Sequence, residues 1–102
     1  KGLSIGENST VKIENLIVQN SKLAIAVKDG SNSYIKNFNS LNNQYDIALF
    51  KKKKEYSNSS LYIKNFHNIK KKILQSKKSV LIVGDKNILG KESNSYINSI
   101  LY

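Results

Sequence analysis

One short motif, in which apolar and polar residues alternate before an asparagine, returns three times along this 102-residue chain. Its copies are Ile13-Glu14-Asn15-Leu16, Ile35-Lys36-Asn37-Phe38 and Ile63-Lys64-Asn65-Phe66. A second motif precedes each copy, as Gly2-Leu3-Ser4-Ile5, Ala24-Ile25-Ala26-Val27 and Asp46-Ile47-Ala48-Leu49. Both motifs recur after 22 residues (3 to 25, 15 to 37), and only the third asparagine is delayed, by extra residues within 51–60. A fixed period with an insertion confined to one copy is typical of a solenoid.

The pattern inside each period favours strands over helices. Each period contains short alternating runs separated by polar turns, and none contains the long helical pattern of a leucine-rich repeat. We therefore predict an all-β fold, a right-handed single-stranded parallel β-helix of about 3–4 coils. Each coil should contain three short strands, at about 3–5, 25–27 and 47–49, then 11–13, 33–35 and 61–63, then 16–18, 38–40 and 66–68.

Stacking the coils predicts the core, because alternate residues of a strand point to the same side. The inward rows should be Leu3, Ile25 and Ile47; Ile5, Val27 and Leu49; Val11, Ser33 and Leu61; Ile13, Ile35 and Ile63; and Leu16, Phe38 and Phe66. Asn15, Asn37 and Asn65 should occupy the bend between the second and third strands, where asparagine tolerates left-handed backbone. Stacked amides can also hydrogen-bond from coil to coil, so we predict an asparagine ladder.

The pattern changes after the third coil. Residues 80–82 continue the second strand of the coil, and Gly84-Asp85 then predicts a hairpin that caps the stack. We expect coils and hairpin over 1–90, and a tail over 91–102 that forms a short helix or a strand and docks on the β-helix or on a partner. No comparable cap precedes Lys1, so the first coil should pair with a second copy of the chain or with upstream coils.

At this point the residues resemble a known family. Over nearly the whole chain, their order is similar to the C-terminal part of bacterial right-handed β-helix proteins of the pectate-lyase-like superfamily. More narrowly, it resembles those associated with spore-coat-H-type kinase-like and lamin-tail domains. The resemblance implies a surface or extracellular setting and no defined reaction, because no lyase or hydrolase motif maps here and the chain has no arginine. It rests on segments 1–7, 24–29 and 45–53 and on the hairpin at Leu81-Ile82-Val83.

Composition adds a strong positive charge. The net charge is +10, and every basic residue is a lysine. This favours nonspecific attraction to polyanions, whereas the absence of arginine weakens the case for specific nucleic-acid recognition. The chain has no cysteine and no apolar run long enough for a transmembrane segment. The candidate polyanion-binding residues are Lys51, Lys52, Lys53, Lys54, Lys70, Lys71 and Lys72.

Two outward features point to a carbohydrate. Ser4, Ala26 and Ala48 form an outward row of small residues, which could be the floor of a glycan groove or a surface for the tail or a second subunit. Tyr34 and Tyr62 should stack in adjacent coils, beside Lys36 and Lys64, where they could bind sugars or simply be cross-strand neighbours.

Candidate catalytic groups are few. Asp46 and Asp29 are candidate functional acids, although Asp46 could equally be a turn residue that is hydrogen-bonded to the backbone. Glu7 and Asp29 occupy equivalent turns and could share calcium, yet two solvated acids explain them as well. With His67 as the only histidine, neither a catalytic triad nor a zinc site can be assembled, and we predict no metal and no cofactor.

These observations favour a non-catalytic β-helix module of a bacterial surface or secreted protein, which serves as a structural scaffold and could also bind acidic polysaccharide. Two alternatives stay open at this point. One is the C-terminal part of a polysaccharide lyase or hydrolase, and the other is a nonspecific polyanion binder.

Overall fold

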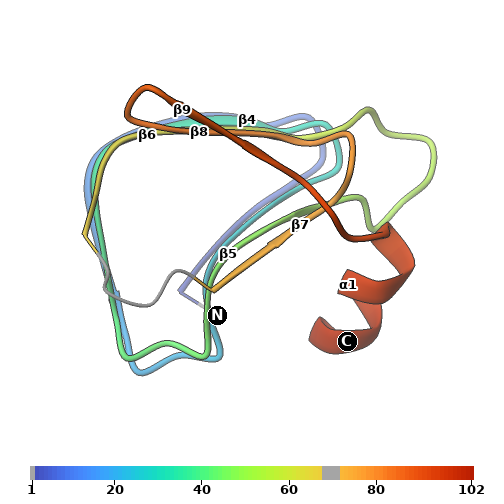
Figure 1. The fold of residues 1–102 in the computed structure, drawn as a ribbon. Coiled ribbons are helices and arrows are strands. Elements are labelled where there is room, and N and C mark those ends of the chain that lie inside the picture. The colour runs from blue at the N-terminus through green and yellow to red at the C-terminus, as the bar shows by residue number, and fades with distance from the viewer. Residues whose placement is uncertain (1, 68–71) are drawn as a thin grey trace.

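The computed structural model is a parallel β-helix of four coils, and it describes residues 2–67 and 72–102. Figure 1 looks down the helix axis, where the successive coils lie nearly one behind the other. One side of each coil belongs to a four-stranded sheet of β1 (Leu3–Ile5), β3 (Leu23–Lys28), β5 (Tyr45–Phe50) and β7 (Ile73–Gln75). The rest belongs to a five-stranded sheet of β2 (Thr10–Gln19), β4 (Asn32–Leu41), β6 (Ser60–His67), β8 (Val80–Val83) and β9 (Lys86–Leu89).

The strand register confirms the predicted rows. Leu3 pairs with Ile25 and Ile25 with Ile47, while Leu16 pairs with Phe38 and Phe38 with Phe66. Neighbouring coils therefore place like side chains above one another, about 4.8 Å apart. The rings of Phe38 and Phe66 stack with centroids 5.1 Å apart. This continuous apolar column is the core, and its side chains in the second and third coils are buried, except that Phe66 is partly buried.

The asparagine ladder is confirmed as a chain of hydrogen bonds. The side-chain amide of Asn37 donates to the carbonyl of Asn15 at 2.9 Å, and that of Asn65 donates to Asn37 at 2.9 Å. These residues lie on the outside of the coils, so the ladder fixes the stacking of the bend and leaves the core apolar.

The bend itself differs from the prediction. The second and third predicted strands are one continuous strand, so β2 and β4 run through the bend at the asparagine. Asn15 and Asn37 do not have positive φ, and the left-handed asparagines of the described chain include Asn20 and Asn42, one corner later. The prediction was wrong because a strand can turn gradually through extended backbone, whereas the sharp corner before β3 and β5 needs left-handed residues.

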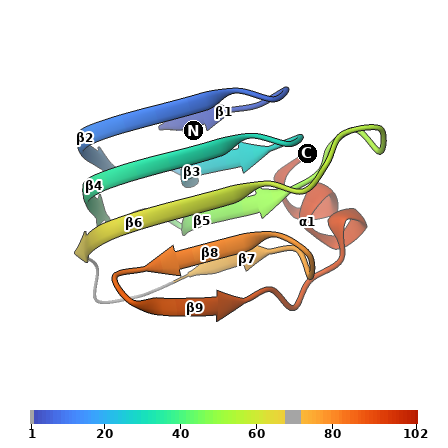
Figure 2. The same ribbon diagram turned by 90° about the horizontal axis from the view of Figure 1, so that it is seen from above.

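The last coil ends as predicted, in an antiparallel hairpin. β8 and β9 pair from Val83–Lys86 to Val80–Leu89, and Gly84 adopts φ +62° in the turn between them. Glycine suits this position because it has no Cβ, so it adopts the left-handed conformation of the turn without steric strain. Figure 2 shows this hairpin at one end of the stack and β1 and β2 at the other.

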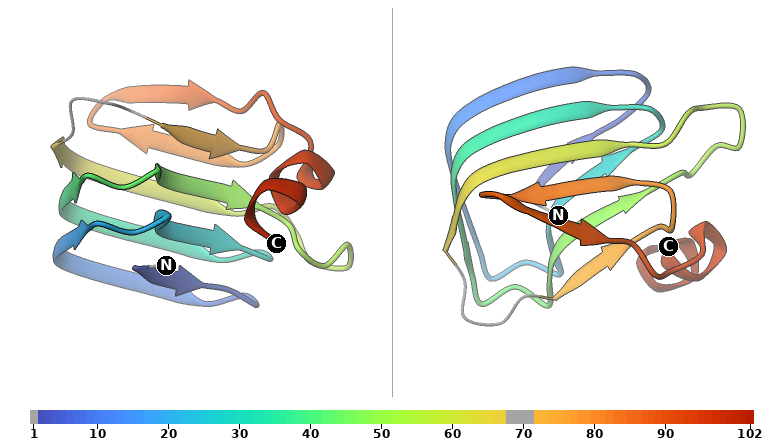
Figure 3. Two further views of the ribbon diagram at one scale, coloured as in Figure 1. Left: turned by 90° about the horizontal axis from the view of Figure 1, so that it is seen from below. Right: turned by 45° about the horizontal axis from the view of Figure 1, so that its top comes forward.

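The tail forms a helix, α1 (Asn94–Leu101), and returns to the side of the stack. Ser93 caps its N-terminus by accepting a hydrogen bond from the Tyr96 backbone N–H at 3.1 Å. Ile97 is fully buried against the outer side of the four-stranded sheet. Figure 3 shows the helix lying beside the ends of the middle coils.

Candidate binding face

The outer side of the five-stranded sheet carries the two predicted tyrosines. Lys12, Tyr34, Tyr62 and Ile82 lie in register on β2, β4, β6 and β8, so they form one outward column across four coils. The tyrosine rings are stacked, with centroids 5.3 Å apart and an interplanar angle of 14°. Figure 2 looks down on this side of the sheet.

The ring stacking determines which surfaces remain for a ligand. Each tyrosine presents one face to the other, so the second face of Tyr34 looks toward β2 and that of Tyr62 toward β8. The Lys12 ammonium lies 5.8 Å from the centre of the Tyr34 ring. Tyr62 is 37% exposed. Tyr62 is therefore the more exposed ring of the pair, and its second face looks toward Ile82.

A shallow groove of about 400 Å³ follows this column, and we call it the tyrosine groove. Polar side chains of the neighbouring column border it, which gives an apolar floor with hydroxyl and amide groups along one side. The groove is lined by Thr10, Val11, Lys12, Asn32, Ser33, Tyr34, Ser60, Leu61, Tyr62, Val80 and Ile82.

The lysine of the groove is not one of the two predicted from the sequence. Lys12 lines the groove, whereas Lys36 and Lys64 do not. Lys36 instead pairs with Glu14 on the adjacent coil at 3.0 Å, and this hydrogen bond raises its pKa. The period of 22 residues would have identified Lys12, because it places Lys12 directly beside Tyr34 in the stack.

The predicted small-residue strip is not an open groove floor. Ser4 is exposed, but Ala26 and Ala48 are completely buried beneath α1, in a cluster with Phe50 and Ile97. The tail covers the strip because alanine lets a helix approach the sheet closely and bury its apolar side. Ala26 and Ala48 are therefore excluded as carbohydrate-contacting residues.

Asp46 is a buried structural acid. It is 1% exposed, and its two carboxylate oxygens accept hydrogen bonds from the Ser40 hydroxyl and from the Lys72 backbone N–H. Its own N–H donates to the Lys72 carbonyl at 2.8 Å. The carboxylate thus joins two coils, and burial leaves it no open surface on which to meet a polymer.

Asp29 is also a buried acid whose carboxylate bonds to the next coil, and it lies in the turn that follows β3. One carboxylate oxygen accepts the backbone N–H groups of Lys52 and Lys53 at 2.8 and 2.9 Å, and the side chain is 2% exposed. Its partner in the calcium hypothesis, Glu7, binds the Lys53 ammonium at 2.5 Å. Within the described part of the chain, no three acidic or histidine side chains are grouped to hold a metal ion.

The lysine run 51–54 forms an exposed loop at the side of the stack, with several specific contacts. Besides the Lys53–Glu7 pair, the Lys52 ammonium lies 4.3 Å from the centre of the Tyr102 ring. Lys54 and Lys72 are exposed, while Lys70 and Lys71 lie outside the described residues, as does Lys1. The described lysines of this set do not converge on the tyrosine groove.

The Glu7–Lys53 pair makes the loop sensitive to pH. The hydrogen bond from Lys53 holds the pKa of Glu7 below its ordinary value. The ion pair therefore stabilises the folded chain fully at pH values above the ordinary pKa, and this stabilisation is lost as the pH falls through the lowered pKa. We expect an NMR titration of Glu7 to return toward the ordinary pKa in Lys53→Gln. Lys54→Gln is the matched control and should leave the titration unchanged. Equal Glu7 titrations in the parent and Lys53→Gln would contradict the pairing.

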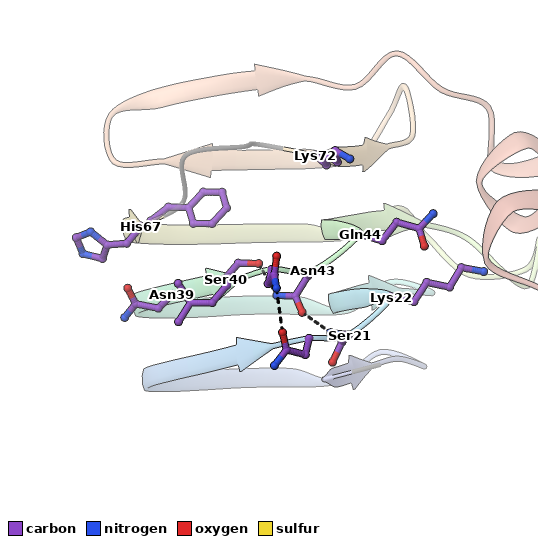
Figure 4. Close-up of a pocket in the computed structure, with 12 residues that line it drawn as sticks. Ser21, Lys22, Asn39, Ser40, Asn43, Gln44, His67 and Lys72 are labelled. Carbon is purple, nitrogen blue, oxygen red and sulfur yellow. Dashed lines mark hydrogen bonds between the residues drawn. The ribbon is translucent and has the colours of Figure 1, made fainter.

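A second hollow lies at the corner where the chain turns from β2 and β4 toward β3 and β5, and Figure 4 shows the residues that line it. Its polar side chains largely bind one another. Asn42 donates to Asn20 at 3.2 Å, which is a second ladder, and Asn43 binds both Ser40 and the Ser21 backbone N–H. These residues stabilise the corner. His67 points away from the Ser40–Asn43 cluster in Figure 4.

No family model, curated protein or solved structure matches this chain. The pectate-lyase-like resemblance therefore stays an expectation, and the tyrosine groove is described by its own geometry. Of the helices in the described residues, none has the length and apolarity needed to cross a bilayer.

Proposed function

We propose that this chain is a non-catalytic β-helix module of a bacterial surface or secreted protein, and that it binds acidic polysaccharide in the tyrosine groove. The observation that carries the proposal is the stacked Tyr34–Tyr62 pair in an open groove, with a lysine at one end. Sugars offer C–H groups that pack on aromatic rings, and an acidic sugar adds a carboxylate that an ammonium attracts.

The direction of the groove suits an extended polymer. The column from Lys12 to Ile82 crosses four coils, so a chain lying in it meets charge, aromatic rings and aliphatic side chains in sequence. Tyr62 is 37% exposed and Val80, which also lines the groove, is 44% exposed, so both offer apolar surface to a sugar ring. Asn32 and Ser60 supply donors and acceptors for sugar hydroxyls along the border.

Tyr62→Ala should weaken binding of a polyuronate, such as polygalacturonate, at least tenfold in calorimetric titration. The expected reason is loss of the aromatic surface, since truncating a central aromatic hot spot costs about 2 kcal/mol or more, and a tenfold loss needs about 1.4 kcal/mol. Tyr96→Ala is the matched control, because Tyr96 is 50% exposed on α1, outside the groove. Equal weakening by both variants, or no binding by the parent protein, would contradict the proposal.

Nonspecific attraction of polyanions by the lysine loop is the second candidate, and the exposure of Lys52, Lys53 and Lys54 favours it. The same titrations separate the two functions. Binding through the loop would survive Tyr62→Ala, would fall steeply with salt, and would not distinguish polyuronate from DNA.

A further inference from the structure

Among the strands of the described residues, β1 and β2 of the first coil are paired on one side only, so this end of the stack is open. Ile5 and Val18 of this coil are buried, but its other inward side chains are only partly buried, whereas the matching residues of the second coil are buried. The partly buried set is Leu3, Val11, Ile13 and Leu16. Figure 2 shows that neither α1 nor the loop 51–59 extends over this end.

This end also carries hydrogen-bonding groups that have no protein partner among the described residues. In each ladder the later coil donates to the earlier one, so Asn15 and Asn20 are used as acceptors. Within residues 2–67 and 72–102, their side-chain nitrogens donate no hydrogen bond to a protein group. Every second residue of an edge strand likewise directs its N–H and C=O away from the sheet. The end therefore has both apolar and polar groups to satisfy.

The inward positions along the edge strand β2 are arranged symmetrically about the middle of the strand. Val11, Ile13, Leu16 and Val18 pack inward, and the exposed pair Glu14-Asn15 lies midway between them at the bend. Reversing the strand about that midpoint exchanges Val11 with Val18 and Ile13 with Leu16. The reversed strand therefore presents the same inward pattern and bends at the same place.

We propose that a second copy of this chain pairs with the open end about a two-fold axis through the Glu14–Asn15 bend. β2 then pairs antiparallel with β2 of the second copy, which brings Val11 opposite Val18 and Ile13 opposite Leu16. Such a contact is isologous and closes after two copies.

The outward side chains are complementary in the same register. Glu14 lies opposite Asn15 of the second copy, so the unused Asn15 amide meets a carboxylate acceptor, twice in the dimer. Lys12 lies opposite Ile17 of the second copy. Ile17 is 64% exposed, and the aliphatic part of a lysine can cover it.

The same axis suits the four-stranded sheet. Reversing β1 about Ser4 exchanges Leu3 with Ile5, and both of these residues belong to the core. In Figure 1 the bend of the long strands lies across the core from the strands of the four-stranded sheet, so one axis can pass through both. Both edges of the first coil are thus paired by a single operation.

Sedimentation equilibrium of the 102-residue chain tests the proposal without any ligand. The parent protein should be a dimer, and Ile17→Lys should raise the dissociation constant at least tenfold, because it places a second ammonium group against Lys12 of the other copy. Lys12→Glu combined with Ile17→Lys should restore the dimer, because the opposed charges then attract. The control is Leu89→Lys, which alters an exposed residue at the other end of the stack and should remain dimeric.

Three results would overturn the proposal. They are a parent protein that stays monomeric at every concentration, an unchanged dimer in Ile17→Lys, and equal dissociation by Leu89→Lys. The register has its own check, because the chain has no cysteine: Glu14→Cys mixed with Asn15→Cys should form disulfide-linked heterodimers on oxidation.

Discussion

Phe38→Ala should destabilise the protein by about 3–5 kcal/mol, which is a large part of the free energy of unfolding of a domain of this size. Phe38 is completely buried in the second coil, and its ring stacks on Phe66 of the third. Truncation removes an aromatic ring from the middle of a column that adjacent coils hold at fixed spacing. The coils cannot close the cavity without losing the strand register on either side. Urea unfolding followed by circular dichroism measures the effect.

Two variants show whether the position in the stack matters. Phe38→Leu keeps most of the apolar volume and should cost about 1–1.5 kcal/mol. Leu16→Ala changes the same row in the first coil, where the side chain is only partly buried, and should cost less than Phe38→Ala. A Phe38→Ala variant within about 1 kcal/mol of the parent protein would mean that the column repacks, contrary to this account.

The repeat predicted the core because a solenoid converts sequence period into spatial contact. Residues such as Ile13 and Ile35 lie at the same phase of successive coils, so the alignment of the motifs already gives the strand register. The bend at Asn15 was harder, since a local motif does not show whether a strand stops or curves. The left-handed corners at Asn20 and Asn42 precede the next strand, and the paired asparagines at a spacing of 22 were the signal for them.

The candidate site was predicted in part for the same reason. Tyr34 and Tyr62 occupy one column, so their stacking follows from the repeat, and Lys12 follows once the first coil is included. Ala26 and Ala48 illustrate the opposite case. Alternation along β3 and β5 shows that these residues point outward, but not that a helix from the end of the chain covers them. Such a contact depends on the path of the tail, which no period describes.

Asp46→Ala should cost about 3 kcal/mol, because it removes the acceptor of two hydrogen bonds, one of them buried. The carboxylate accepts from the Ser40 hydroxyl and from the Lys72 N–H, and hydrogen bonds to a charged group contribute about 1.5–3 kcal/mol each. Asp46→Asn keeps one carbonyl oxygen and should lose roughly half as much. Glu55→Ala is the control, since Glu55 is an exposed acid and its removal should change stability by less than about 0.5 kcal/mol.

The same variants distinguish a structural acid from a catalytic one. A structural Asp46 predicts lower unfolding midpoints in urea, with polyuronate affinity unchanged wherever the variant is folded, because the carboxylate lies away from the tyrosine groove. A catalytic Asp46 predicts the reverse, in which Asp46→Asn stays fully stable and abolishes turnover of a uronic-acid polymer. The burial of Asp46 and its contacts across two coils favour the first result, since a carboxylate held on both oxygens has no exposed atom to offer a substrate.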